Sequence, residues 1–140
     1  MSAGSERRRA AVMQVALYAV MCLAVGAKLD ALVFGRSPSW AVLGISAGPW
    51  LWASTLVELC LAALLLTRRG NVAALGIAAL SVLFAAFLLL FQSSFAGEAC
   101  GCLGSIEVPL DSHLLLLGGL FLLSLGVATS LAGRRPHVGG

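Results

Sequence analysis

The sequence predicts an all-α membrane protein, a bundle of four transmembrane helices. Hydrophobic residues make up 60% of the 140 residues and charged residues only 11%, and the mean hydropathy is +1.01. A soluble domain carries about 25% charged residues, so this chain has too few polar groups to cover its surface in water. The apolar residues are concentrated in four stretches, which span about 10–27, 50–67, 72–91 and 114–132.

Each stretch has the length of a transmembrane helix, since about 17 to 25 residues cross the roughly 30 Å of hydrocarbon in a bilayer. Helices are expected because backbone groups in lipid must be satisfied within their own segment. The first stretch follows a basic start, as in a signal peptide, but it exceeds the roughly 7 to 15 apolar residues of such a peptide. We therefore expect a retained helix and a single four-helix membrane domain over residues 1–140.

The basic residues predict the orientation of the bundle. Seven of the nine fall in the N-terminal segment, the connection between spans two and three, and the C-terminal tail. They are Arg7, Arg8, Arg9, Arg68, Arg69, Arg134 and Arg135. With four spans, these three regions share one side of the membrane, and the positive-inside rule assigns that side to the cytoplasm. The prediction is a multi-pass protein of the bacterial inner (cytoplasmic) membrane, N-in and C-in.

The two long connections, 30–49 and 92–113, then face the periplasm or the cell exterior. Trp40, Trp50 and Trp52 lie near the start of the second span, where we expect interfacial anchors. Nucleic acid is not an expected partner, because the arginines form separate short clusters rather than one basic surface. The lipid bilayer is the partner that the composition indicates.

The second outer connection contains the sequence GEACGCLGS, in which Cys100 and Cys102 flank Gly101. A disulfide requires Cα atoms about 4.4 to 6.8 Å apart, and Gly101 permits the bend that this spacing needs. The ring would be small and strained, and strained, exposed disulfides exchange readily. Disulfides also persist outside the cytoplasm. We therefore predict a redox pair formed by Cys100 and Cys102, with Gly101 as the turn.

Two other interpretations of this loop remain open. It can be a tight turn that happens to contain thiols, or it can bind a metal through Cys100, Cys102 and His113. Zinc sites usually begin with two to four residues between cysteines, whereas thiolates can also bind Cu(I). His113 also has a redox interpretation, since a nearby imidazolium would favour a thiolate.

Glu58 lies within the second span, and Lys28 directly follows the first. Glu58 lies about 13 Å below Pro49 at 1.5 Å per residue, near mid-bilayer. A charge there is costly, so Glu58 should face the interior, pair with a cation, or be protonated. We predict that Lys28 pairs with it inside the bundle, in the polar wall of a small cavity. Cys22 and Cys60 are expected to behave as small buried hydrophobes.

Taken together, these residues resemble the MauE/DoxX-like family of small redox-associated membrane proteins. The similar segments are GAKLDALVF, LWASTLVELCLAALLL and CGCLG. CGCLG is similar to the Cys-Gly-Cys-Phe-Gly signature of the MauE branch, with Leu103 in place of the aromatic residue. Lys28 and Glu58 match the family's lysine after helix one and acid in helix two.

The resemblance implies a role, beside a thioredoxin-like partner, in maturing a disulfide-rich periplasmic enzyme such as methylamine dehydrogenase. Vitamin K epoxide reductase and DsbB are similar four-helix proteins, and that analogy suggests a quinone as cofactor, although no Cys-x-x-Cys motif occurs here. The leading hypothesis is a membrane thiol–disulfide protein with a disulfide-containing client. A non-catalytic assembly subunit or chaperone is the alternative, and a Cys/His metal-binding membrane protein is the third.

Overall fold

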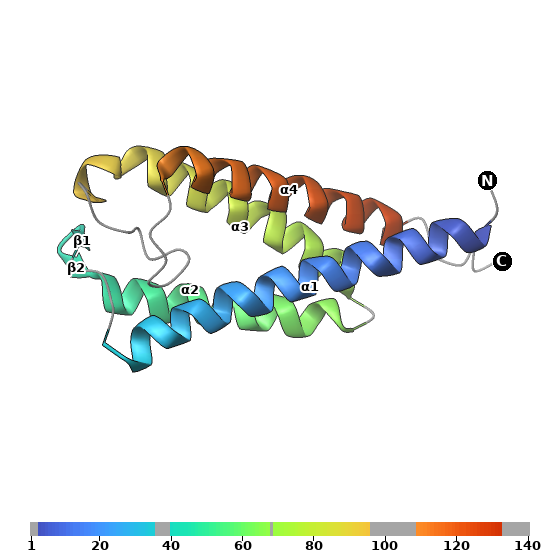
Figure 1. Ribbon diagram of the computed structural model, residues 1–140, viewed down its shortest axis with the longest axis horizontal. Coiled ribbons are helices and arrows are strands. Elements are labelled where there is room, and N and C mark those ends of the chain that lie inside the picture. Colours follow the sequence, from blue (N-terminus) through green and yellow to red (C-terminus); the bar gives the residue numbers. More distant parts are fainter. Residues whose placement is uncertain (1–2, 36–39, 68, 96–108, 133–140) are drawn as a thin grey trace, which may run out of the picture.

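The computed structural model describes residues 3–35, 40–67, 69–95 and 109–132. Four long helices dominate it, accompanied by a minimal hairpin and one 3₁₀ turn (Figure 1). The elements in chain order are α1 (Ala3–Val33), β1 (Ala41–Val42), β2 (Ile45–Ser46), α2 (Ala47–Leu65), α3 (Gly70–Leu90), η1 (Gln92–Phe95) and α4 (Leu110–Ala132).

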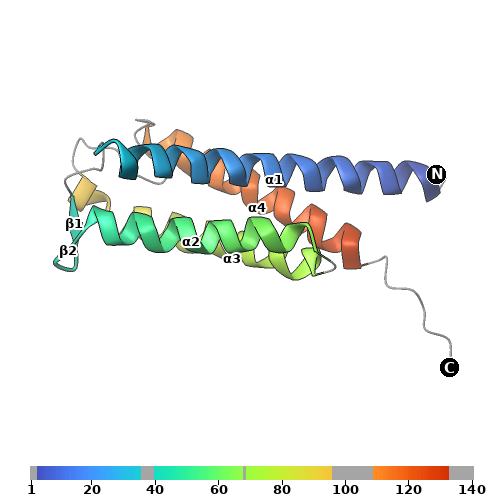
Figure 2. The same ribbon diagram turned by 90° about the horizontal axis from the view of Figure 1, so that it is seen from below.

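The helices run alternately up and down, as in other four-helix bundles. Each helix packs against its neighbour in the chain, and α1 closes the ring against α4. The start of α1, the α2–α3 connection and the end of α4 lie at one end of the bundle, which we call the arginine end because it carries Arg8, Arg9 and Arg69 (Figures 1 and 2). The hairpin, η1 and the start of α4 lie at the opposite end, the hairpin end.

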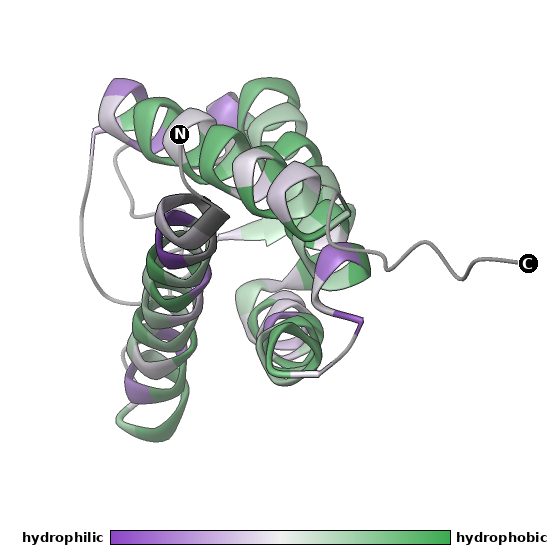
Figure 3. Ribbon diagram, turned by 90° about the vertical axis from the view of Figure 1, so that its right-hand side faces the viewer, coloured by the Kyte–Doolittle hydropathy of each residue, from purple (hydrophilic) through white to green (hydrophobic). Residues whose placement is uncertain are grey.

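All four helices are long and apolar enough to cross a membrane, which confirms the predicted four-helix bundle at that level. The spans are Arg8–Val33, Ala47–Leu65, Gly70–Leu90 and Leu110–Ala132. Their outward faces are apolar as well as their inner faces (Figure 3). Leu23 and Leu115, for example, are 74% and 77% exposed. A helix that is apolar on all sides belongs in lipid or in a protein core, so the outside of this bundle suits a bilayer.

Several helix ends differ from the predicted spans, and the largest differences at the hairpin end are the end of α1 and the start of α4. Helix α1 continues to Val33 instead of ending near Ala27, because nothing before Gly35, at φ +66°, breaks it. Helix α4 begins at Leu110, directly after Pro109, rather than at residue 114. Proline fixes a helical φ and lacks the N–H group that a first turn leaves unpaired. Hydropathy alone missed both extensions because they contain charged residues.

The hairpin in the first outer connection was not predicted. Ala41 pairs with Ser46 and Val42 with Ile45. The turn residues Leu43 and Gly44 have φ values of 54° and 76°, and two positive φ values are the signature of a type I′ turn. A side chain is disfavoured in this region. The turn has the usual glycine at its second position, but leucine instead of asparagine or aspartate at its first. The sequence pattern typical of this turn is therefore incomplete.

Two apolar clusters occupy the ends of the bundle interior. The cluster at the arginine end draws on all four helices and consists of Leu17, Met21, Ala62, Leu65, Ala73, Ala74, Ile77, Val127 and Ala128. The cluster at the hairpin end is built from Trp40, Val42, Ala47 and Leu88, with Trp50, Phe87, Phe91 and Leu117 packed against it.

Two glycines allow close helix approach. A Cβ on Gly76 would lie 2.7 Å from Leu61 Cδ2, and one on Gly126 would meet Met13 Cε. Both glycines therefore let a neighbouring helix come near, as small residues commonly do in membrane bundles. Gly118 and Gly119, by contrast, have open space beside them.

Candidate functional site

A buried ion pair joins α1 to α2 in the bundle interior. Lys28 Nζ donates a hydrogen bond to Glu58 Oε1. The two side chains are 1% and 5% exposed. This confirms the predicted pairing of Lys28 with Glu58. The opposite charges cancel, so the pair adds no net charge to the apolar interior. A buried charge without such a partner would be strongly destabilising.

The helix period explains why Glu58 points inward. The buried positions of α2 include Leu51, Thr55, Glu58, Ala62 and Leu65, which recur every three or four residues. Such spacing defines one face of an α-helix. Glu58 therefore takes a position on the interior face that an apolar residue would otherwise occupy, and it must find a partner there.

The surroundings of the pair satisfy it only in part. Lys28 Nζ lies 5.0 Å from the centre of the Phe84 ring, within range of a cation–π interaction. The second carboxylate oxygen, Glu58 Oε2, is buried, and no group in the described part of the chain hydrogen-bonds to it. A buried acceptor without a donor costs about 1 to 3 kcal/mol. Glu58 is thus paired at one oxygen and unsatisfied at the other.

The larger cavity beside the pair, the central cavity, has a volume of ≈ 580 Å³. Its walls come from α1, α3 and α4, and Glu58 is the residue that α2 contributes. The side chains of Cys22, Ser81 and His113 supply further polar groups in an otherwise mainly apolar lining. Pockets with a few polar groups in an apolar wall are typical small-molecule sites.

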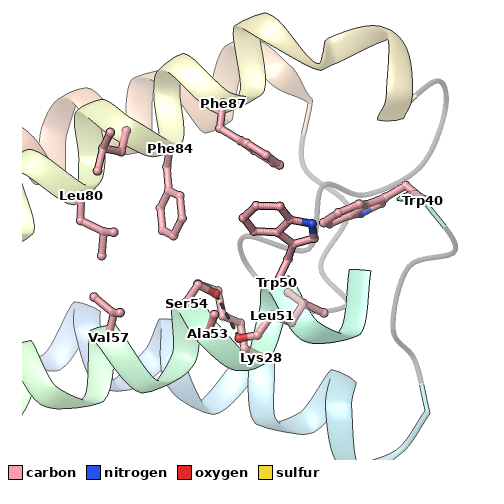
Figure 4. A pocket seen from close by; sticks show the side chains of 11 residues that line it. Lys28, Trp40, Trp50, Leu51, Ala53, Ser54, Val57, Leu80, Phe84 and Phe87 are labelled. Atoms are coloured by element: carbon pink, nitrogen blue, oxygen red, sulfur yellow. Dashed lines mark hydrogen bonds between the residues drawn. The ribbon is translucent and has the colours of Figure 1, made fainter. Parts of the chain in front are cut away.

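A second cavity, the aromatic cavity, has a volume of ≈ 340 Å³ and lies mainly between α2 and α3 (Figure 4). Lys28 borders it together with Trp40, Trp50, Phe84 and Phe87. The Phe87 ring centre lies 6.4 Å from that of Trp40 and 5.8 Å from that of Trp50, within the usual range for aromatic pairs. Leu80 and Phe84 border both cavities, while Lys28 borders the aromatic cavity and Glu58 the central cavity.

The three tryptophans predicted as interfacial anchors differ in exposure. Trp52 is 49% exposed, as an anchor at the membrane surface would be. Trp40, by contrast, is 6% exposed and belongs to the hairpin-end cluster, and Trp50 packs against that cluster. The hairpin causes the difference, because it folds Trp40 back over the helix ends; the Trp40 carbonyl accepts a hydrogen bond of 3.1 Å from Ala47 N.

His113 and Ser81 join the candidate site from α4 and α3. His113 is 4% exposed and borders the central cavity, as Glu58 does. Its predicted influence on the thiols stays a prediction. Sequence analysis missed Ser81, whose hydroxyl donates to Ile77 O at 2.9 Å. A serine in a leucine-rich span does not by itself indicate a functional site, because its hydroxyl can hydrogen-bond to a carbonyl of the preceding helical turn.

The structure describes two of the four cysteines, Cys22 and Cys60. Cys100, Gly101 and Cys102 lie outside the described residues; their segment, 96–108, connects η1 to Pro109. Cys22 and Cys60 are exposed on the outside of the bundle, so the expectation that both are buried is wrong. Cys22 directly follows the buried Met21, and Cys60 lies two positions from the buried Glu58 and Ala62, differences that hydropathy cannot detect. Cys22 also borders the central cavity.

Chemically, the described site can hold a mainly apolar molecule next to a buried ion pair. In the part of the chain that the structure describes, no three His, Cys, Asp or Glu side chains gather into a metal site. Comparisons with family models, curated proteins and solved structures found no match to this chain.

Proposed function

We propose that this protein is a membrane thiol–disulfide redox protein. Cys100 and Cys102 exchange with an extracytoplasmic thioredoxin-like protein and so support disulfide formation or maturation in a secreted or periplasmic client. The resemblance to the MauE branch suggests a client similar to methylamine dehydrogenase. The bundle lies in the bacterial cytoplasmic membrane with both termini inside.

The orientation is supported by the arginine end. Arg8, Arg9 and Arg69 are exposed there, and the positive-inside rule favours a cytoplasmic location for this end. The hairpin end then faces the periplasm or exterior. The segment with the two thiols connects η1, which ends at Phe95, to α4, which begins at Leu110, and η1 and the start of α4 both lie at that end (Figure 1). The thiols therefore belong to a connection on the side where disulfides persist.

The exchange itself needs only the two thiols and the disulfide of the partner. The thiolate of one cysteine attacks a partner sulfur and forms a mixed disulfide, and the partner releases its other sulfur as a thiolate. The second cysteine then attacks the mixed disulfide. The products are a Cys100–Cys102 disulfide and a reduced partner, so two electrons pass to the partner. The reverse sequence reduces the pair.

The buried ion pair between Lys28 and Glu58 is the observation that carries this proposal. The resemblance matched three features of the chain: the Cys-Gly-Cys motif, this lysine and this acid. Two of the three, although 30 residues apart in sequence, form one buried ion pair. Buried ionic groups in a membrane bundle are costly and are a functional hypothesis by default. A pair retained at such a cost supports a function for the bundle interior in addition to anchoring.

Capture of the mixed disulfide tests the proposal. We expect that either Cys100→Ser or Cys102→Ser accumulates a covalent complex with a thioredoxin-like protein, because the remaining cysteine attacks and the loop no longer supplies the second thiol that resolves the intermediate. Non-reducing gels and mass spectrometry of the captured species give the readout. The double variant should form no complex. Cys22→Ser and Cys60→Ser are matched controls, since they remove thiols from the outer faces of α1 and α2 and should leave the complex unchanged.

The same variants separate this function from a non-catalytic assembly role. An assembly subunit would support client maturation with both loop cysteines replaced by serine, and would lose it only when the outer connections are deleted. If no single variant forms a complex and the double variant matures its client normally, the redox proposal is wrong.

A further inference from the structure

The central cavity lies between the two apolar clusters of the bundle interior. On α4, Leu117 packs against the hairpin-end cluster and Leu120 against the arginine-end cluster, and both residues border the cavity. The α1 wall is built from small side chains, because Val20, Ala24 and Ala27 recur on one face of the helix and two of them are alanine. The clusters fill the ends of the bundle, and a volume of ≈ 580 Å³ remains between them.

The border of the cavity continues onto the outer surface of the bundle. Leu23 of α1 and Leu116 of α4 both border it and are 74% and 56% exposed. The outer faces of the helices are apolar and suit a bilayer (Figure 3). Toward the arginine end, α1 and α4 come into close contact, since a Cβ on Gly126 would meet Met13 Cε. The cavity is therefore reached from the lipid side, between α1 and α4, and it ends where these two helices meet.

The lining favours an apolar occupant over water. Two of its polar side chains are already engaged, since Glu58 pairs with Lys28 and the Ser81 hydroxyl donates to a carbonyl of its own helix. Apart from Cys22 and His113, the other lining residues are apolar or glycine. Cavities with apolar walls stay dry and take up apolar molecules. Apolar groups from the membrane would supply the dispersion contacts that an empty space forfeits.

The dimensions favour a hydrocarbon chain over a helix of a partner protein. The α1 residues that border the cavity lie between Val20 and Ala27, a length of about 10 Å at 1.5 Å per residue. A helix that crosses the membrane needs about 30 Å and is about 10 to 12 Å wide with its side chains. An acyl chain is narrower and can end inside the bundle. The cavity extends from His113, in the first turn of α4, to Leu120, so the chain enters from the leaflet on the hairpin side.

We propose that the central cavity binds one acyl chain of a phospholipid from the leaflet on the hairpin side. The chain enters between Leu23 and Leu116, and its methylene groups pack against Ala24, Leu117 and Leu120. The headgroup stays at the membrane surface, and the bound chain completes the wall of the bundle between α1 and α4. Binding requires neither the loop thiols nor a particular orientation in the membrane, so it is separable from the exchange proposed above.

A photoreactive lipid tests the proposal. The full chain is placed in nanodiscs of phosphatidylcholine, with a small fraction of a phosphatidylcholine that carries a diazirine in the middle of one acyl chain. After brief irradiation, mass spectrometry of the peptides locates the crosslinks. We expect them on Leu120 and Phe84, which border the cavity and are only partly exposed, and also on Leu122, which is 68% exposed and lies outside the cavity. Crosslinks confined to residues outside the cavity would mean annular lipid only and would overturn the proposal.

Two matched variants assign the crosslinks to the cavity. Ala24→Phe places a ring at the centre of the α1 wall, whereas Ala19→Phe makes the same change at an exposed position of α1 that does not border the cavity. Ala24→Phe should lower the crosslink yield at Leu120 about tenfold, since excluding even two methylene groups changes a binding constant by about that factor. The yield at Leu122 should stay constant, and Ala19→Phe should change neither yield. An equal yield at Leu120 in all three proteins would contradict the assignment.

The circular dichroism of each variant verifies that the bundle is folded. If Ala24→Phe does not fold, Gly26→Leu takes its place, because Gly26 borders the cavity and a Cβ there would meet nothing within 4 Å. The same selective loss at Leu120 is expected from Gly26→Leu. Unchanged crosslinking in that variant would overturn the proposal, and it would leave the redox proposal unaffected.

Discussion

Replacing Lys28 by methionine should destabilise the bundle by roughly 3 to 5 kcal/mol, the usual cost of removing one partner from a buried ion pair. Methionine retains most of the apolar stem, so the change isolates the ammonium group. Glu58 would then have neither the hydrogen bond from Nζ nor a compensating charge, at a site where both side chains are almost completely buried. Unfolding by SDS in mixed micelles, followed by circular dichroism, measures the difference in the free energy of unfolding.

A second variant shows whether the cost belongs to the pair. The double change Lys28→Met with Glu58→Leu should recover most of the loss, because apolar replacement of both partners of a buried pair is often neutral or stabilising. Arg9→Met is the matched control, since Arg9 is an exposed cation on the same helix, and it should leave stability unchanged. Glu58→Gln should be milder than Lys28→Met for folding. Additive losses in the double variant would mean that the two residues do not interact.

Phe87→Ala should be the second most damaging change, with an expected loss of roughly 3 kcal/mol. Phe87 contacts Trp40 of the hairpin connection, Trp50 of α2 and Phe91 of its own helix, with the last ring centre at 5.1 Å. Removing the ring takes away three aromatic pairs and enlarges the aromatic cavity, which Phe87 borders. The same SDS titration applies, and tryptophan fluorescence should shift because Trp40 and Trp50 lose their shared neighbour.

Leu90→Ala provides the comparison for this prediction. Leu90 lies on α3 less than one turn away and is 76% exposed, so its side chain contacts surrounding lipid rather than the cluster. We expect little change in stability or fluorescence from it. Comparable losses from Phe87→Ala and Leu90→Ala would show that the aromatic cluster contributes no specific packing.

The sequence was sufficient to predict the membrane bundle because the governing constraint is strong. The chain has four stretches of membrane-spanning length, separated by polar connections. In lipid, each stretch must satisfy its own backbone hydrogen bonds, so each is expected to form a helix. The pairing of Lys28 with Glu58 followed for a related reason, since few ionisable residues lie in the spans and an isolated charge there is costly. Both predictions depend on the large energetic penalty for exposing polar groups to hydrocarbon.

The features that escaped prediction depend on geometry instead. Whether Cys22 faces in or out is decided by one helical position, and the span around it is too uniformly apolar to show a face. The hairpin turn at Leu43 and Gly44 lacks the usual asparagine or aspartate. Ser81 and His113 border the central cavity only because α3 and α4 bring them beside α1. The order in which the helices pack is tertiary information, which hydropathy and periodicity do not contain.

Thiol trapping in intact cells is the most direct test of the proposed redox function. With Cys22→Ser and Cys60→Ser in place, Cys100 and Cys102 are the remaining thiols, and a membrane-impermeant maleimide reports their state by a mass shift. The redox function predicts two added labels after mild reduction and none after oxidation, with a reversible change between the two states. Cysteines that stay unmodified under reducing and oxidising conditions alike would contradict it.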